Sequence, residues 1–274
     1  MDTSKVMLEM EKETRCQTKL QRLLLISQKE QWNIDDLDWE GLTFEEMPIY
    51  FQQHLATVFS HLRYGEQMAL QCIQRLRNEI TDPIQIKLLD IQIQDEKRHV
   101  VFFQRILQSL HQPHPLRESF QKLMTNIYNA PTTEMLLVGM HIMIENIAHS
   151  LFQSAQDVIT HATVSPSNTS LISLQEITNH WIPNYVMIDE SRHLAIGHIM
   201  LLSYIPRLTL EQKVQLEGTI TRWGTILLEM VDDPDMLQSI GLQQSKHAIQ
   251  CLKDVNLRLR QIDIDVQIPL PESI

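Results

Sequence analysis

The sequence predicts an all-α protein, a four-helix bundle with accessory helices, and three observations support this fold class. Only 7 of the 274 residues are Gly, whereas average usage of roughly 7% would give about 19. The alternation of Val, Ile and aromatic residues that is typical of strands is hard to find. Long segments lie instead between helix start signals and prolines that stop helices. With 43% apolar residues, the chain can bury a sizeable core.

The N-terminal part is predicted to form a polar helix, a loop and then the first long helix. Residues 3–31 are charged, and in the loop at 32–43 the residues Trp32 and Trp39 are the expected anchors. Thr43 and Glu46 have the spacing of a capping box, which predicts that the first long helix starts there and runs to about residue 79.

The next segments supply the other long helices. Asp82-Pro83 opens the second, which is expected to run to about residue 110. A short helix ends near Tyr128, and the third long helix covers about 132–162. A helix from about residue 170 meets Pro183, which is expected to break or kink it, so the fourth long helix is placed at about 183–204.

The C-terminal part is predicted to add two more helices. Thr209 and Gln212 form a capping box for a helix to about residue 231. A last helix covers roughly 236–260, before an irregular tail that starts at Ile262. We expect one domain over residues 1–274, with core helices at about 44–204 and accessory helices at 3–31 and 209–260.

Composition excludes several classes of partner. The net charge of -11 argues against nucleic-acid binding, which needs a basic surface. Residues 1–15 lack the apolar centre of a signal peptide, and no run of about 18 apolar residues is evident, so no membrane span is expected. Cys16, Cys72 and Cys251 share no metal-ligand spacing, and reduced thiols in the cytoplasm are expected.

Two five-residue motifs contain residues that can bind metal ions. Residues 95–99 read DEKRH and residues 189–193 read DESRH, and each contains Glu-x-x-His. Residues three apart share one helix face, so Glu96 with His99, or Glu190 with His193, can bind one metal ion. A single such motif is more often a solvated charged face. Both copies have apolar neighbours on the same stripe, where a carboxylate without a partner is costly.

Two further glutamates complete the predicted site. Glu66 and Glu145 are lone carboxylates on apolar stripes of the first and third long helices. The order along the chain is Glu, Glu-x-x-His, Glu, Glu-x-x-His, which is the arrangement of di-iron and di-manganese carboxylate bundles. The predicted metal ligands are therefore one group per long helix: Glu66, Glu96, His99, Glu145, Glu190 and His193. Carboxylate-rich sites with one imidazole per ion suit iron or manganese.

The aspartates that precede the two ligand glutamates are predicted to support the histidines. Metal-bound histidines usually donate their other N–H to a carboxylate. In an antiparallel helix pair, Asp95 could hold His193, and Asp189 could hold His99. The alternative is that both aspartates lie on a charged surface.

With these residues in place, the sequence resembles the ferritin-like di-iron oxygenases and oxidases related to ribonucleotide reductase small subunits. Within that group it looks most like bacterial proteins related to p-aminobenzoate N-oxygenase. The resemblance spans about residues 35–205, and its matching stretches are 64–70, 95–99, 139–145 and 189–197. It implies the same six ligands, O2 activation at a reduced di-iron centre, and oxidation of a small organic substrate.

The chain also departs from these relatives. Ribonucleotide reductase small subunits often have a radical tyrosine one turn after the first ligand histidine, where this chain has Phe103, and the tail after Ile262 has no tyrosine. The N-oxygenase has an extra histidine ligand where this chain has Val186. Met68 and Met140 replace the valine and tyrosine that form a crosslink in ligand-binding oxidases of the superfamily.

His141 and His149 lie one turn before and one turn after Glu145 and are expected to face the interior near the metals. Each could be an additional ligand, a proton donor or a substrate contact, and the alternative is a buried histidine bonded to a neighbour.

Three functions stay open at this point. The first is an O2-dependent oxygenase or oxidase that uses two iron ions, or a Fe/Mn or manganese centre. It would need an external electron donor and hence a reductase partner, because no G-x-G-x-x-G motif is present. The second is a ferritin-type iron-handling protein, and the third is a radical-generating subunit of a partner enzyme. A homodimer is expected for the first.

Overall fold

A computed structural model of the chain describes residues 3–110, 114–160, 169–231 and 246–270. Helices make up most of these residues, and the described part contains no strand, which confirms the predicted all-α fold. The helices of the first half are α1 (Thr3–Lys29), η1 (Ile34–Asp36), α2 (Ile49–Glu79), α3 (Pro83–Ser109) and α4 (Glu118–Tyr128). Those of the second half are α5 (Thr133–Val138), η2 (Gly139–Ile144), α6 (Glu145–Thr160), α7 (Thr169–Gln175), η3 (Glu176–Val186), α8 (Met187–Tyr204), η4 (Ile205–Arg207), α9 (Leu210–Val231) and α11 (Lys246–Gln261).

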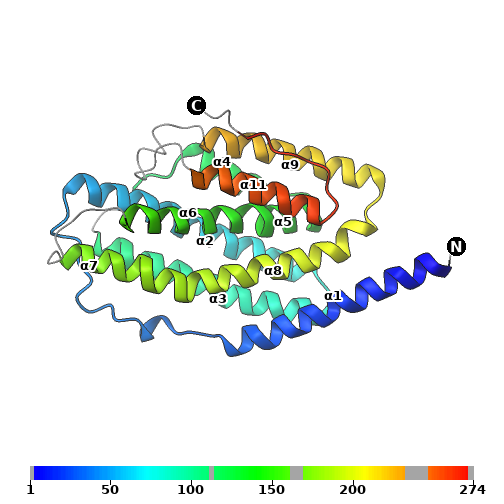
Figure 1. Cartoon of the computed structure of the whole chain (residues 1–274), viewed down its shortest axis with the longest axis horizontal. Coiled ribbons are helices and arrows are strands. Elements are labelled where there is room, and N and C mark those ends of the chain that lie inside the picture. The colour runs from blue at the N-terminus through cyan, green and yellow to red at the C-terminus, as the bar shows by residue number, and fades with distance from the viewer. Residues whose placement is uncertain (1–2, 111–113, 161–168, 232–245, 271–274) are drawn as a thin grey trace.

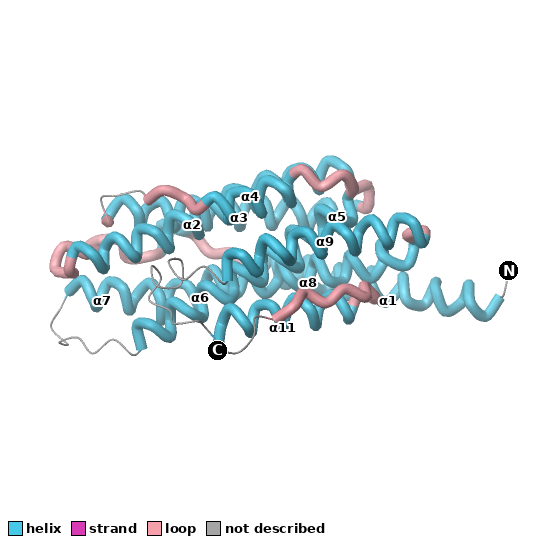
Figure 2. Tube along the Cα trace, turned by 90° about the horizontal axis from the view of Figure 1, so that it is seen from above, coloured by secondary structure: helices cyan, strands magenta, loops and turns pink. Residues whose placement is uncertain are grey.

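Four long helical runs form the central bundle. They are α2, α3, the continuous run from α5 through η2 to α6, and the continuous run from α7 through η3 to α8. Figures 1 and 2 show these runs side by side along the long axis of the molecule. The predicted four-helix core is therefore present, with one predicted ligand group on each run.

Accessory helices cover the outside of the bundle. Helix α1 packs along α3 and α8, and its N-terminal end extends past the bundle (Figure 1). On another side α9 packs against α4, and α11 packs against α6. The first of the two predicted accessory regions thus closes the face of the bundle that carries both Glu-x-x-His helices.

The capping box predicted at Thr43 and Glu46 does not form, and α2 begins six residues later than Thr43, at Ile49. The Glu46 side chain accepts a hydrogen bond from the backbone N–H of Thr169, at the start of α7, at 2.9 Å. The backbone N–H of Glu46 donates to Ser170 Oγ at 3.0 Å. The segment is held by a distant helix, and Pro48 disfavours helical backbone in the residue before it.

Other start signals are confirmed. The Asp82 side chain accepts from the N–H groups of Ile84 and Gln85, and Pro83 occupies the first position of α3. The Thr209 and Gln212 box is complete, because each side chain accepts from the other residue's backbone N–H, at 3.2 and 2.8 Å. Of the last predicted helix, residues 236–245 lie outside the described part, and α11 covers the rest.

Of the two predicted effects of Pro183, a break is absent, and the helical run passes through this residue instead of starting at about 183. Pro183 lies inside η3, an 11-residue π-helical segment. Hydrogen bonds in such a segment run between residues five apart, as from the Met187 N–H to the Ile182 carbonyl. The wider turn accommodates a residue that has no N–H and clashes with an α-helical carbonyl. The third run contains a second π segment, η2, where the Glu145 N–H donates to the Met140 carbonyl.

The buried apolar side chains form two clusters, and the predicted ligands lie between them. On α2, Phe59 belongs to one cluster and Ala69 to the other, with Glu66 between them in the chain. On α3, Ile93 and Phe102 stand on either side of Glu96 in the same way. The bundle therefore encloses a polar layer at mid-length, bounded at both ends by apolar core.

One helical stretch, Thr133–Gln153, is long and apolar enough to cross a membrane by length and composition, which the sequence prediction missed. In its most apolar window, 78% of the residues are buried inside the protein. This is the behaviour of a core helix in a bundle, because the third run is covered by its neighbours on most sides.

Candidate metal centre

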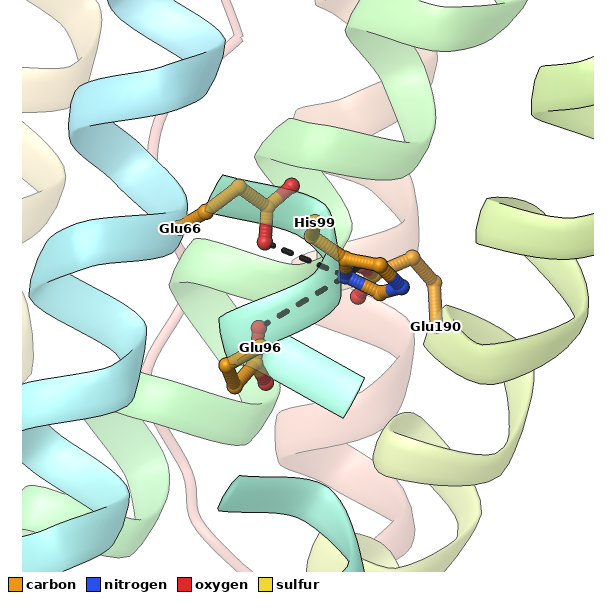
Figure 3. A group of neighbouring side chains, drawn as sticks. All are labelled: Glu66, Glu96, His99 and Glu190. Carbon is orange, nitrogen blue, oxygen red and sulfur yellow. Dashed lines mark hydrogen bonds and ion pairs between the residues drawn. The ribbon is translucent and has the colours of Figure 1, made fainter. Parts of the chain in front are cut away.

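The six predicted ligands come together in the polar layer. Their ligand atoms form two groups, each with all atoms within 4.8 Å of one another. One group contains Glu66, Glu96, His99 and Glu190, and Figure 3 shows these four side chains pointing toward one another from α2, α3 and α8. The other contains Glu96, Glu145 and His193. All six residues are buried, and none is more than 4% exposed.

The first group surrounds His99. Its Nδ1 atom lies 3.1 Å from Glu190 Oε1, 3.4 Å from Glu66 Oε2 and 3.7 Å from Glu96 Oε2. Glu96 and His99 share a face of α3 because they are three residues apart. One imidazole nitrogen thus faces oxygens from three helices.

The second group surrounds His193 in the same way. Its Nδ1 atom lies 3.3 Å from Glu96 Oε1, 3.4 Å from Glu190 Oε2 and 3.6 Å from Glu145 Oε1. Glu96 and Glu190 each direct one oxygen to His99 and the other to His193. These two glutamates are therefore shared between the groups, whereas Glu66 and Glu145 each serve one.

Cations would stabilise the ionised form of the buried carboxylates in this cluster. Burial raises the pKa of Glu66 and of Glu145 well above its ordinary value, and the charge of Glu190 raises both further. Buried oxygens remain without a hydrogen-bond partner, namely Glu96 Oε2 and both oxygens of Glu190. Four carboxylates beside two imidazoles fit two divalent cations, since such oxygen-rich sites suit iron or manganese.

The aspartates take the predicted crossed positions. Asp189 Oδ2 lies 3.1 Å from His99 Nε2, and Asp95 Oδ2 lies 3.3 Å from His193 Nε2. Each aspartate also pairs with the arginine three residues later, Asp95 with Arg98 and Asp189 with Arg192. Arg98 reaches across to Asp189 at 3.3 Å, so the four side chains form one ion-pair cluster behind the histidines.

Solved structures share this fold, and two of the three described here are reported with two metal ions. The dimanganese(II) NrdF protein of Streptococcus sanguinis has a TM-score of 0.70 at 13% sequence identity, over 95% of this chain and 91% of that chain. The R2-like ligand-binding oxidase of Sulfolobus acidocaldarius has a TM-score of 0.65 at 17% identity, over 91% and 92%. A variant of an R2-like ligand-binding oxidase with a Mn/Fe cofactor has a TM-score of 0.65 at 15% identity, over 88% and 92%.

The chain has the ferritin-like R2 fold. No protein-family model matches the sequence, and no curated protein matches it either. At these identities the structural likeness establishes the fold of the chain, and the buried Glu/His cluster is its own evidence for a site that can hold two metal ions.

Trp32, predicted only as a loop anchor, contacts the polar layer of this R2-like bundle. Its Nε1 donates a hydrogen bond to Asp189 Oδ2 at 2.8 Å. Its ring stacks near His99 with centroids 6.4 Å apart, and the Arg98 guanidinium lies 5.1 Å from the centre of the ring. No local sequence signal could have found this contact, because 157 residues separate Trp32 from Asp189.

Gln92 is a second residue that the sequence reasoning missed. It is fully buried, and its Nε2 donates to Glu96 Oε1 at 3.0 Å and to Glu145 Oε1 at 3.1 Å. Its position four residues before Glu96 puts both on one face of α3. That spacing was a usable signal, but a lone Gln on an apolar stripe is easily overlooked.

The two histidines near Glu145 differ in their surroundings. His141 is fully buried and contacts Gln92 Oε1 through Nε2 at 3.2 Å, as expected of a buried histidine bonded to a neighbour. His149 is half-buried. Burial lowers its pKa, and its charged neighbours include Glu190 and Arg258.

Phe103 lies in the apolar cluster next to the polar layer. It is fully buried and stacks between Phe59 and Phe152, with ring centroids 6.1 and 5.9 Å away. The residue one turn after His99 is thus part of an aromatic stack.

A hollow reaches the polar layer from the side of α4. It lies between α2, α4 and α6, is narrow and partly open to solvent, and is lined mainly by apolar side chains. Glu66 and Glu145 form part of its wall, and His61, Gly65 and Phe120 also line it.

Proposed function

We propose that the protein is an O2-dependent dimetal oxidase or oxygenase that acts on a small, largely apolar organic molecule. The observation that carries this proposal is the position of the hollow. It opens onto Glu66 and Glu145, the two glutamates that each serve a single histidine group. Sites of this kind, apolar with a few converging polar groups, are the usual form of small-molecule pockets.

The lining of the hollow supports a substrate with an apolar body. Leu62, Ala69, Met124 and Leu151 offer only carbon and sulfur to a ligand. His61 is held by hydrogen bonds of both ring nitrogens, to the Thr57 carbonyl at 2.8 Å and from the Arg117 N–H at 3.1 Å. The wall of the hollow is therefore mostly apolar, and the carboxylates of Glu66 and Glu145 form its polar part.

Glu66, Glu96, His99 and Glu190 would hold one ion, and Glu96, Glu145, His193 and Glu190 the other. Bound iron or manganese would supply the redox chemistry with O2, while the protein sets the ligands and the shape of the site. Asp95 and Asp189 orient the imidazoles by accepting from their Nε2 atoms, which leaves both Nδ1 atoms turned toward the carboxylates.

We further propose an external electron donor, a cytoplasmic location and a homodimer. Trp32 is half-buried and hydrogen-bonded to Asp189, which in turn contacts His99. This makes the Trp32 side of the bundle the docking side that we favour for a reductase.

Sedimentation velocity tests the proposed homodimer, and a monomer at micromolar concentration would contradict it.

The second candidate is a radical-generating subunit of a partner enzyme. The NrdF likeness of the fold and the hydrogen-bonded chain from Trp32 through Asp189 to His99 favour it. The aromatic stack of Phe103, where a tyrosine would be needed, counts against it. Electron paramagnetic resonance after O2 exposure of the reduced iron form separates the two. A stable organic radical would support this second candidate and contradict the first.

Metal content tests the site itself. Glu96→Ala and Glu190→Ala each remove a carboxylate shared by both groups, so neither variant should retain two ions per chain by elemental analysis. Glu211→Ala, on the exposed first turn of α9, is the control and should bind metal as the wild type does. Circular dichroism checks that the variants are folded. Full iron content in both shared-carboxylate variants would contradict the proposal.

Substrate binding is tested at Gly65. A Cβ added there would lie 3.7 Å from Phe120 Cζ, so Gly65→Val would fill the hollow without a backbone clash. We expect unchanged metal content and about a tenfold or larger rise in KM for any compound that stimulates O2 consumption in a panel of small aromatic acids, amines and fatty acids. An unchanged KM would place the substrate elsewhere.

A further inference from the structure

Gln92 is the only neutral side chain among the described residues that donates hydrogen bonds to the predicted ligands. Both hydrogens of its amide are used, one on Glu96 Oε1 and one on Glu145 Oε1. Both oxygens belong to the group around His193. A buried amide that is fully engaged in this way is fixed in place, because each lost hydrogen bond would leave a buried polar atom unpaired.

The orientation of this amide follows from its partners. Ionised carboxylates, the form that binds metal, only accept, so in that form the nitrogen of Gln92 faces Glu96 and Glu145 and its oxygen faces His141. His141 must then carry a proton on Nε2, which lies 3.2 Å from Gln92 Oε1. Burial lowers the pKa of His141 to about 3, and the charge of His193 contributes, although the Leu137 carbonyl acts in the opposite direction. The ring is therefore neutral, with its single proton directed at Gln92.

The position of His141 is itself determined by packing. A Cβ on Gly197 of α8 would lie 2.1 Å from His141 Cβ and 2.2 Å from its Cγ, so the imidazole lies directly against the α8 backbone. His141 also lies in the π segment η2, where the wider turn changes the direction of side chains relative to an α-helix. Three of the four helical runs thus meet at the contact between His141 and Gln92.

Among the described residues, the group around His99 has no neutral donor equivalent to Gln92. Both oxygens of Glu190 are buried without a hydrogen-bond partner, and Glu66 has its hydrogen-bonding contact with His99. The aspartate and arginine cluster does not create this difference, because it supports both histidines through the same kind of contact. Trp32 also lies on one side only, but it bonds Asp189 and not a predicted ligand. Gln92, held by His141, is therefore the neutral support that reaches ligand carboxylates on one side of the site.

We propose that Gln92, held by His141, is a positioning residue that makes the two metal positions unequal by fixing the carboxylates of Glu96 and Glu145 on the His193 side. This inference rests on the proposed dimetal site. Charge-assisted hydrogen bonds are about twice as strong as neutral ones, so they restrict the rotation of both carboxylates. Partners of metal ligands typically contribute about 10- to 100-fold in metal affinity.

Four variants test this proposal by Mn²⁺ titration, with electron paramagnetic resonance reporting free, singly bound and paired ions. Gln92→Leu removes both donors at similar volume, and His141→Phe removes the group that holds Gln92. His141→Gln is the conservative variant, because its amide can still donate to Gln92. Gln85→Leu is the matched control, since Gln85 is a buried glutamine on the same helix that is bonded to Tyr204 instead of the ligands.

We expect the wild type to bind two ions. In Gln92→Leu, one ion should bind with unchanged affinity and the other about 10- to 100-fold more weakly, so that half-filled sites give an isolated Mn²⁺ signal. His141→Phe should change binding in the same direction, and His141→Gln should restore it. Two unchanged affinities in Gln92→Leu, or an equal loss at both positions, would overturn the inference. Failure of the wild type to bind two ions would instead contradict the proposed function.

Discussion

Gly197→Ala is expected to destabilise the protein, although alanine normally favours a helix over glycine. The added Cβ would lie 2.1 Å from His141 Cβ, 2.2 Å from Cγ and 2.7 Å from Cδ2. Carbon atoms prefer separations of about 3.5–4.0 Å, so His141 or the α8 backbone must move by roughly 1.5 Å. The hydrogen bond from His141 to Gln92 is already 3.2 Å long, so a shift of this size would break it.

The magnitude follows from two costs and one gain. Overpacking in a rigid core costs about 1–3 kcal/mol, and an unpaired buried amide oxygen on Gln92 adds about 1–3 kcal/mol. Replacing a helical glycine by alanine stabilises the protein by roughly 0.5–1 kcal/mol. The free energy of unfolding should therefore fall by about 1–5 kcal/mol, which we would measure by urea denaturation of the metal-free protein.

Gly218→Ala is the control for this prediction. Gly218 lies within α9, and the nearest atom to an added Cβ is the flexible Arg222 Nη1 at 3.8 Å. This variant should gain roughly 0.5–1 kcal/mol from the reduced entropy of the unfolded chain. The two alanine substitutions should thus have opposite signs. A Gly197→Ala protein as stable as the wild type would refute the close packing of His141 on α8.

Further predictions concern the apolar cluster and the pH dependence of stability. Phe103→Ala should cost about 3–5 kcal/mol because it empties a fully buried aromatic stack, whereas the exposed neighbour Val101→Ala should change stability by less than about 0.5 kcal/mol. Burial lowers the pKa of His61, and Arg117 lowers it further, although the Thr57 carbonyl raises it. The unfolded chain therefore binds this proton first, and stability should fall as the pH drops below about 6.5. His61→Gln, which can keep both hydrogen bonds without titrating, should reduce that loss in urea unfolding at pH 7.5 and 5.5; an identical loss would contradict the assignment.

Much of the candidate site could be predicted because its information is local. Glu96 with His99 and Glu190 with His193 are each three residues apart, so helical geometry alone puts each pair on one face. The apolar neighbours of Glu66 and Glu145 indicated that these faces point inward. The structure places all six side chains in one buried layer, with Asp95 and Asp189 in contact with the opposite histidines.

Predictions that rested on short signals without their tertiary context were less secure. The Thr43 box had the right residues, but Glu46 binds the N-terminus of α7 instead. Pro183 had the residue type of a helix stop, but the π segment η3 carries the chain through it. At Glu46 a contact with a distant helix outweighs the local preference, and at Pro183 a π-helical winding accommodates the residue.

The sequence by itself determined the helical class and the order of the candidate ligand groups along four helices, because helical periodicity converts spacing directly into a shared face. It also offered Asp95 and Asp189 as possible partners of the opposite histidines. Only the tertiary structure decided which oxygen faces which imidazole, that Trp32 reaches Asp189, and that Gln92 and His141 support one side of the site alone. Those features depend on how helices distant in the sequence pack together. A Cβ added at Gly197 would lie 2.1 Å from His141, so the third and fourth helical runs pack very closely at this point. The spacing of residues within either run cannot specify such a distance between the two runs.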